Sequence, residues 1–410
     1  MLNKDNQREL AYVVTIDDIK PIPGKDRVEC AVVGGWTIMV RKGQFEPGDV
    51  GIYFEIDSKV PPMPAFEFLA PKKYKIKTQK YGAFYSQGLL MHPDDFGWTV
   101  AIEPLAGART EVIVDDDGTP HYWEDESKFL TQKLGVKYAV EEDNKRKSNI
   151  VDKYHKMAQR MGKKFQKQPY KWLMKRMWGK KLLYAIYGRI ADQQGFPSWV
   201  KKTDEERVEN MSWILENKNP WIATEKIDGT STTFTMKRTG KKKEPYLFIV
   251  CSRNVAFVKP DAQLFYNTNV YTEMAEKYNI EAHMKDMLEN HPEWEFVTIQ
   301  GETFGNGIQK NTYNKGEHEL MIFNLVTSDQ GRWPTLKMKE FLEIGYNLPC
   351  VPVVDDNFIL PDTIEELREY VHSKPSVING ALREGIVFRD QEGVRSFKCV
   401  DPAYLIKWHE

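Results

Sequence analysis

Short strand-like runs separated by turn residues follow one another closely near the start of the chain. They lie at 12–16, 28–33, 37–40 and 50–56, and Pro-Gly, Gly-Gly and Pro-Gly-Asp sequences separate them. Strands so close together leave no room for crossover helices, so they must pair antiparallel. The pattern therefore predicts a small antiparallel β-barrel rather than alternating β/α units.

A second group of strand-like runs begins after residue 196, and helical stretches lie near 268–289, 335–344 and 363–372. Thr203 or Asp204 is placed to cap a further helix that ends near Glu216. Neither a GxxxxGK[ST] nor a GxGxxG motif is present, so a doubly wound nucleotide-binding fold is not expected. We predict an α+β domain of mostly antiparallel sheets with flanking helices.

Charge is segregated along the chain although the totals nearly cancel. The chain has 58 Lys and Arg against 59 Asp and Glu, but residues 145–189 hold 15 basic residues and one acidic residue. Seven aromatic residues lie in the same stretch. Basic side chains neutralise phosphates and aromatic rings stack on unpaired bases, so nucleic acid is the expected partner. The candidate contacts are Lys163, Lys164, Lys167 and Lys171. The alternative is a solvated basic helix packed against a neighbouring domain.

These patterns divide the chain of 410 residues into three parts. Residues 1–140 hold the barrel, residues 141–195 form a basic, helical connector, and residues 196–410 form the second domain. Gly195-Phe196-Pro197 marks the last boundary. A length of this size gives room for about 2.7 domains, which agrees with the division.

One short segment of the second domain has the pattern of a covalent catalyst. Residues 225–231 read Glu-Lys-Ile-Asp-Gly-Thr-Ser, so Lys226 ends an apolar strand and enters a turn at Gly229. A lysine attacks only after losing its proton, and its pKa shifts readily on burial. The alternative is a surface hairpin in which Asp228 and Gly229 supply only turn chemistry.

An ordered set of charged and aromatic residues follows on later strands. It consists of Arg253 after a strand, Glu302 at a strand end, Phe323 within a strand, Glu384 before a strand, and Lys398. Together with Lys226, this set resembles the covalent nucleotidyltransferases, the superfamily of polynucleotide ligases and capping enzymes. Phe196-Pro197 with 202–207, and Gly35-Trp36 with Tyr53-Phe54-Glu55-Ile56-Asp57, look like the ATP-dependent RNA ligases of the Deinococcus type. Those ligases have an N-terminal OB module.

The resemblance implies an ATP-dependent RNA ligase that joins a 3′-OH to a 5′-phosphate through lysyl-AMP and adenylylated RNA. Lys226 would carry AMP and Lys398 would assist catalysis. The implied nucleotide-binding residues are Glu225, Lys226, Arg253, Glu302, Phe323, Glu384 and Lys398. Asp228, Glu302 and Glu384 would hold Mg²⁺ or Mn²⁺ through water, since these ions prefer oxygen ligands. Many relatives carry a second lysine where this chain has Val400, and Lys407 is a possible substitute.

Other functions remain open at this point. A non-catalytic OB-type RNA-binding protein would explain the barrel and the connector but not the ordered motifs. DNA ligases and capping guanylyltransferases usually place an OB domain after the catalytic domain, whereas 12 residues follow Lys398 here.

The remaining expectations concern the cellular location, the oligomeric state and the role of residues 1–140. No run of 18 apolar residues occurs, so no membrane span is expected. Four separated cysteines suit a reducing cytoplasm, or that of the host if the gene is viral. We expect a monomer that acts on RNA ends, possibly in a nicked duplex. Because all nucleotide motifs lie beyond residue 196, deletion of 1–140 is expected to leave AMP transfer largely intact.

Overall fold

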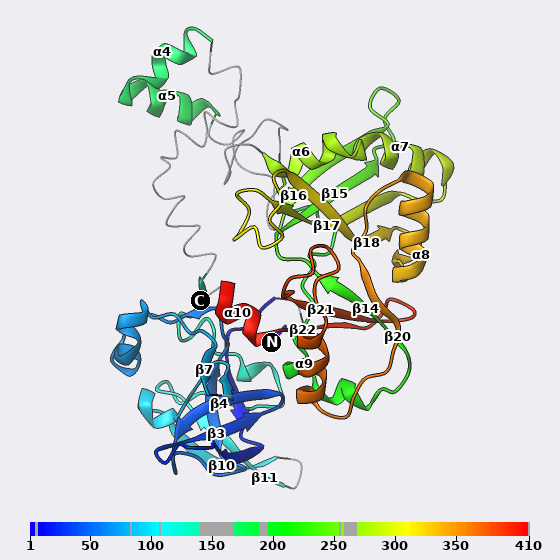
Figure 1. The fold of residues 1–410 in the computed structure, drawn as a ribbon. Helices are drawn as coiled ribbons and strands as arrows, with labels where there is room; N and C mark the ends of the chain where they lie inside the picture. The colour runs from blue at the N-terminus through cyan, green and yellow to red at the C-terminus, as the bar shows by residue number, and fades with distance from the viewer. Residues whose placement is uncertain are drawn as a thin grey trace.

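The computed structural model describes most of the chain (Figure 1). The described residues are 1–4, 7–82, 84–105, 108–139, 167–187, 196–253, 256–257 and 269–408. Figure 1 shows the N-terminal strands grouped at one end, with the two C-terminal sheets beyond them. This mixture of a strand-rich front module and a later antiparallel domain confirms the predicted α+β class.

The N-terminal module is built from antiparallel sheets. One sheet has the order β1-β5-β9, from β1 (Ala11–Thr15), β5 (Val50–Phe54) and β9 (Leu89–Met91). A second has the order β2-β3-β4, from β2 (Asp18–Pro21), β3 (Val28–Val33) and β4 (Trp36–Arg41). Alternate side chains of these strands, Trp36 and Tyr53 among them, are buried in a common core, as period-2 strands require.

Shorter elements complete this module. They are β6 (Ser58–Lys59), β7 (Gln79–Tyr81), β8 (Phe84–Ser86), β10 (Thr99–Leu105), β11 (Ala108–Val114), β12 (Pro120–His121) and β13 (Lys137–Tyr138), with the 3-10 helices η1 (Pro64–Lys72), η2 (Pro93–Phe96) and η3 (Glu126–Lys128). The predicted strands at 12–16, 28–33, 37–40 and 50–56 are therefore all present; 28–33 has the predicted bounds, and the bounds of the others differ by at most two residues.

The described part of the connector contains two helices, α4 (Tyr170–Met174) and α5 (Met177–Tyr187). The rings of Trp172 and Trp178 meet edge to face, and the Arg176 guanidinium lies 3.8 Å from the centre of the Trp172 ring. Both tryptophans are exposed. Of the four lysines predicted to contact nucleic acid, Lys167 and Lys171 are exposed here, whereas Lys163 and Lys164 lie outside the described residues.

The C-terminal domain contains two antiparallel sheets. The four-stranded sheet has the order β20-β14-β21-β22, from β14 (Trp221–Lys226), β20 (Val353–Phe358), β21 (Gly385–Asp390) and β22 (Ser396–Val400). The five-stranded sheet has the order β16-β15-β17-β18-β19, from β15 (Thr230–Arg238), β16 (Tyr246–Ser252), β17 (Phe296–Gly305), β18 (His318–Thr327) and β19 (Gly331–Arg332).

Helices cover one face of each sheet. α6 (Val270–Lys277) and α7 (Ile280–Asn290) bury methionine and leucine side chains against the five-stranded sheet, and α8 (Thr335–Lys339) continues into the π-helical turn η6 (Glu340–Ile344) beside them. α9 (Ile364–Ser373) buries Ile364, Leu367 and Val371 against the four-stranded sheet. The helical stretches expected near 268–289, 335–344 and 363–372 are thus present. α10 (Pro402–Trp408) follows the last strand.

The helix expected from Thr203 or Asp204 to Glu216 is wrong. Residues 201–206 have no regular secondary structure, and short 3-10 turns follow, η4 (Val208–Asn210) and η5 (Ser212–Glu216). The end of this segment lies beside β22, where the Lys398 N–H donates to the Glu206 carbonyl at 2.7 Å and Arg207 forms a parallel bridge with Lys398. Pairing with a strand far along the chain therefore overrides the local capping pattern.

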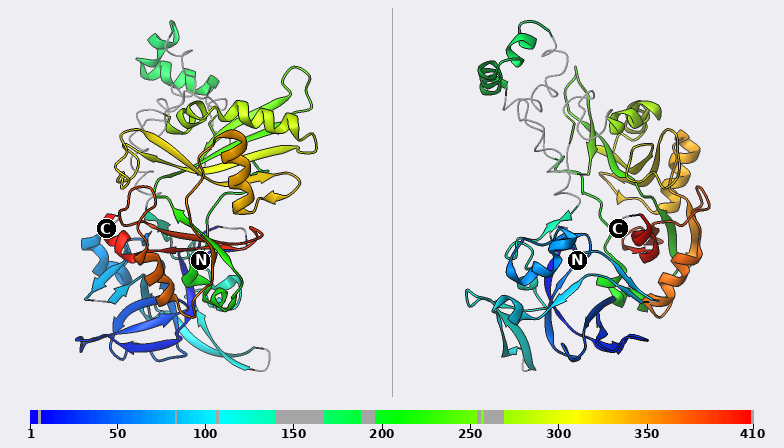
Figure 2. Two further views of the ribbon diagram at one scale, coloured as in Figure 1. Left: turned by 45° about the vertical axis from the view of Figure 1, so that its right-hand side comes forward. Right: turned by 60° about the vertical axis from the view of Figure 1, so that its left-hand side comes forward.

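The two modules are in direct contact. The Gly35 N–H donates to the Glu209 carbonyl at 2.8 Å, and the Trp36 indole donates to the Asn210 side-chain oxygen at 2.7 Å. Ile56 of the N-terminal module packs with Val400 of β22 and Leu405 of α10. Figure 2 shows α10, in red, at this junction. Val400 is thus an apolar contact between the modules, which accounts for its being valine.

We predict that Gly35→Ala weakens the junction. A Cβ at this position would lie 2.1 Å from Ile364 Cδ1 and 2.6 Å from Glu209 Cα, so backbone must move. The expected loss is about 2 kcal/mol of unfolding free energy, the usual cost of overpacking. Denaturant unfolding measures it. Gly345→Ala, where a Cβ meets nothing within 4 Å, is the control. Equal stabilities for the two variants would contradict the prediction.

Candidate active site

The predicted catalytic segment crosses between the two sheets of the C-terminal domain. β14 ends at Lys226 in one sheet and β15 begins at Thr230 in the other, so Ile227, Asp228 and Gly229 form the link. A Cβ on Gly229 would lie 2.4 Å from the Thr303 carbonyl oxygen. Glycine is needed here because the link passes directly against β17.

Lys226 is paired with Glu384. Lys226 lies opposite Gly385 in the β14–β21 register, and its Nζ donates to Glu384 Oε2 at 2.7 Å. Burial lowers the pKa of Lys226, but Glu384, Glu302 and Asp228 more than offset this effect and raise it. Lys226 is therefore a charged ammonium in this arrangement, held at the junction of the two sheets.

Two further carboxylates lie close to this pair. Burial, followed by repulsion from Glu384 and Asp228, raises the pKa of Glu302 to about 8, although Lys226 opposes the shift. Asp228 accepts a hydrogen bond from Tyr404 OH of α10 at 2.8 Å, and its backbone N–H donates to Tyr313 OH. The three predicted metal-binding carboxylates are thus gathered around Lys226.

The atoms of this set are of the kind that a divalent cation accepts, although in the described part of the chain the acidic oxygens close enough to bind one ion directly are those of Asp115, Asp116 and Asp117. Asp228, Glu302 and Glu384 supply only oxygen atoms, which Mg²⁺ and Mn²⁺ accept. Burial is the main cause of the raised pKa of Glu302, with repulsion from Glu384 and Asp228 as smaller contributions. Asp228, Glu302 and Glu384 stay the predicted ligands of such an ion, which they would hold through water.

A second group of charged residues centres on Asp204. Lys398 Nζ donates to Asp204 Oδ1 at 2.8 Å, and Arg253 Nη2 donates to Oδ2 at 2.9 Å. Burial lowers the pKa of Lys398 to about 8, while Asp204 opposes that shift. Burial raises the pKa of Asp204, but Lys398, Arg8 and Arg253 outweigh it and hold the carboxylate ionised. We call Asp204, Lys398, Arg253 and Arg8 the Asp204 cluster.

The other predicted residues occupy different surroundings. Phe323 is half-buried and packs against the apolar cluster that contains Ile227. Glu225 accepts hydrogen bonds from the Ser376 hydroxyl at 2.6 Å and the Val377 N–H at 2.7 Å, so it anchors that loop. Lys407 is exposed, and its ammonium lies 4.9 Å from the centre of the Trp408 ring.

Sequence reasoning missed several residues of this site. The sequence predicts Thr203 or Asp204 as a helix cap, although both lie in the 202–207 run that carries the family resemblance. Tyr313 and Tyr404 hold Asp228, and Arg8 approaches from the N-terminal module. Nothing in the local sequence around Arg8 or Tyr404 distinguishes them, because their partners lie far along the chain.

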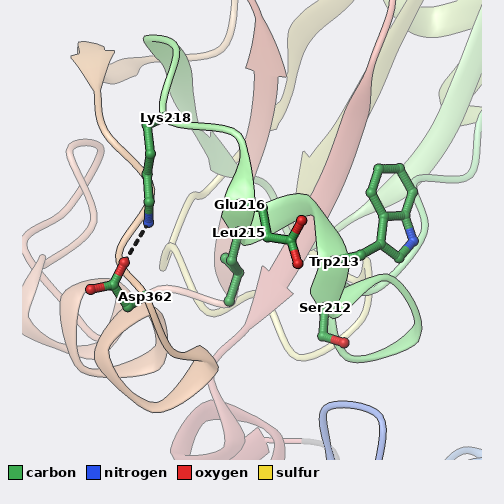
Figure 3. A pocket seen from close by; sticks show the side chains of 6 residues that line it. All are labelled: Ser212, Trp213, Leu215, Glu216, Lys218 and Asp362. Carbon is green, nitrogen blue, oxygen red and sulfur yellow. Dashed lines mark hydrogen bonds and ion pairs between the residues drawn. The ribbon is translucent and has the colours of Figure 1, made fainter.

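A separate pocket lies beside η5 and the loop before α9 (Figure 3). Its lining residues are Ser212, Trp213, Leu215, Glu216, Lys218 and Asp362. Lys218 donates to Asp362 across it at 2.8 Å. None of the predicted site residues lines this pocket, so it is distinct from the group around Lys226.

Lys226 thus lies where the chain crosses between two antiparallel sheets, paired with Glu384, in a domain that follows a strand-rich module. Two family models match the sequence: residues 219–409 match the RNA ligase family, and residues 10–93 match an OB-fold domain. The protein therefore carries an RNA ligase domain preceded by an OB-fold domain, which confirms the predicted enzyme class and two-module architecture.

Similar solved structures are those of an RNA ligase from Naegleria gruberi. The form with PPi, a mutant with ATP and Mn, and a mutant with AMP and Mn each share 24% sequence identity with this chain. Each alignment covers 98% of this chain and 99% of the other, with a TM-score of 0.67. The likeness therefore extends over both modules of the fold. The search of curated proteins found no match. No helix among the described residues is long and apolar enough to cross a membrane.

We predict that Lys398→Ala slows transfer of AMP from ATP to the protein by about two orders of magnitude, the scale of losing one preorganised contact to a developing charge. Single-turnover transfer of labelled AMP measures the rate. Lys407→Ala is the control and should stay close to wild type, because Lys407 is exposed beside Trp408. A slow Lys407 variant with a normal Lys398 variant would reverse the assignment.

Proposed function

We propose that the protein is an ATP-dependent RNA ligase in which Lys226 carries AMP. The observation that carries this proposal is the convergence of Lys226, Glu384, Glu302 and Asp228 where the two sheets of the RNA ligase domain meet. A surface hairpin would not need three carboxylates around one lysine. A binding protein without catalysis would not need the lysine.

Lys226 must lose a proton before it attacks the α-phosphorus of ATP, because an ammonium has no free electron pair. Its hydrogen bond to Glu384 provides a carboxylate acceptor at 2.7 Å. Nζ then bonds to phosphorus while the bond to pyrophosphate breaks, which gives lysyl-AMP. A divalent cation held by the three carboxylates would neutralise phosphate charge and lower the pKa of Lys226.

The remaining predicted residues have complementary roles in this proposal. Lys398 neutralises the α-phosphate and the leaving pyrophosphate. Phe323 offers a ring face to adenine, and the half-exposed Arg253 is suited to the ribose or to the incoming 5′-phosphate. Glu225 contributes through the Ser376–Val377 loop that it anchors.

The RNA substrate is proposed to present a 3′-OH and a 5′-phosphate, possibly in a nicked duplex. The OB-fold domain and the basic connector, with its exposed Trp172 and Trp178, would grip it. We also infer a monomer. A cytoplasmic location is inferred as well, and the four buried cysteines, all without disulfides, support it. Joining assays on nicked and single-stranded RNA substrates distinguish the possible ends.

We predict that Lys226→Ala abolishes AMP transfer to the protein but retains part of the joining of pre-adenylylated RNA, because Lys226 makes no required bond after that stage. Lys226→Arg should fail likewise, since a guanidinium does not deprotonate. Labelled ATP with Mg²⁺ or Mn²⁺ and a denaturing gel measure the adduct. Lys285→Ala, an exposed change on α7, is the control.

Three outcomes discriminate the alternatives. Normal ATP-dependent joining by Lys226→Ala would end the assignment of the nucleophile. An adduct with GTP alone would indicate a capping guanylyltransferase. The absence of an adduct with any nucleotide, combined with tight RNA binding, would favour the non-catalytic RNA-binding protein.

We also predict that neutralising Lys163, Lys164, Lys167 and Lys171 weakens RNA binding and flattens its salt dependence. Four lost phosphate contacts should reduce the slope of log affinity against log salt by about three units. Fluorescence anisotropy over a salt series measures it. Neutralising the exposed Lys241, Lys242 and Lys243 is the control. An unchanged slope would identify the connector as a solvated basic face.

A further inference from the structure

The Asp204 cluster joins the two modules within the proposed catalytic site. Arg8 belongs to the N-terminal module, and its Nε lies 3.5 Å from Asp204 Oδ2. On its other side, Arg8 Nη1 lies 3.8 Å from Glu55, which is fully buried. One guanidinium therefore lies between a carboxylate of the N-terminal module and the carboxylate that holds Lys398.

Two hydrogen-bond donor atoms of Arg8 are unused within the described part of the chain. Its side chain is 14% exposed, and among the described residues its Nε and Nη2 atoms are buried without a hydrogen-bond partner. The 3.5 Å approach to Asp204 is an ion pair but too long for a good hydrogen bond. Two donors next to a buried carboxylate can shorten that approach when another donor leaves.

Binding of ATP would create this situation. In the proposed reaction Lys398 moves its hydrogen bond from Asp204 to the nucleotide phosphates. Asp204 would then be a buried carboxylate that has lost its closest cation, a costly state unless another cation replaces it. Arg253, also bound to Asp204, is half-exposed and is itself proposed to contact substrate.

We infer that Arg8 of the N-terminal module is a positioning residue for AMP transfer. Its guanidinium compensates the negative charge of Asp204 when the Lys398 ammonium turns to the phosphates of ATP. The inference rests on the proposed ligase function. It also revises the expectation that deletion of residues 1–140 leaves AMP transfer largely intact. Removing them would take Arg8 from the Asp204 cluster, so AMP transfer should depend on the N-terminal module.

The test compares single-turnover AMP transfer, in the full chain and without RNA, across ATP concentrations. Arg8→Ala should raise the ATP concentration for half-maximal rate at least about tenfold, because it removes one partner of a desolvated charge pair. Arg8→Lys should recover part of the loss, since it restores the charge but not the fork of donors. Arg41→Ala, an exposed change on β4, is the control.

A double-mutant cycle separates this role from a structural one. In the Asp204→Asn variant, position 204 has no negative charge to compensate. Adding Arg8→Ala to this variant should therefore change the ATP dependence of AMP transfer little. An equal Arg8→Ala penalty in the wild-type and Asp204→Asn backgrounds would overturn the inference, as would a normal ATP dependence for Arg8→Ala. If Arg8→Ala does not fold, Arg8→Gln is judged by the same two criteria. Failure of the wild type itself to form an adduct would instead count against the proposed function.

Discussion

The ion pair between Lys226 and Glu384 is the interaction around which the proposed site is organised. A lysine at this depth needs a carboxylate within hydrogen-bonding distance, and Glu384 lies 158 positions away in the sequence. The antiparallel pairing of β14 with β21 brings them together. The next residues cross to the second sheet, where Gly229 lets the chain pass against β17 and thus brings Glu302 alongside. One strand pairing and one glycine therefore assemble side chains from both sheets.

Charge is divided between two neighbouring centres. Three acidic side chains surround the single cation of Lys226, whereas the single carboxylate of Asp204 is shared by three cations. A nucleoside triphosphate with a divalent cation has the complementary arrangement, because its positive ion suits the acidic centre and its negative phosphates suit the cationic one. This division supports the proposed use of ATP. It also explains the role of Asp204, whose carboxylate offsets the repulsion among the neighbouring cations.

Much of this architecture could be predicted from the sequence. Apolar strand runs with Gly and Pro between them are local signals, and β3 has the bounds that its valine-rich run indicates. The segment around Lys226 indicates a candidate nucleophile by itself, whereas the resemblance to the ligases implies Glu302, Glu384 and Lys398. The fold explains how residues so far apart in the sequence can meet.

The parts that sequence could not supply depend on contacts between distant segments. The run around Asp204 has the composition of a helix start, yet its backbone pairs with β22 and its carboxylate binds Lys398. Position 400 holds a valine where many relatives have a second lysine, and this valine packs against Ile56 of the N-terminal module. Arg8 has no local signature at all. In each case a contact between distant segments determines the structure, and the sequence pattern of one segment does not reveal that contact.

In the proposed reaction, Lys226 is the residue that becomes covalently attached to AMP. Peptide mapping by mass spectrometry, after the wild-type protein has reacted with ATP and Mn²⁺, identifies the modified residue. We predict one acid-labile AMP group on the peptide that contains Lys226, attached to Nζ. An AMP group on any other residue, with Lys226 unmodified, would contradict it.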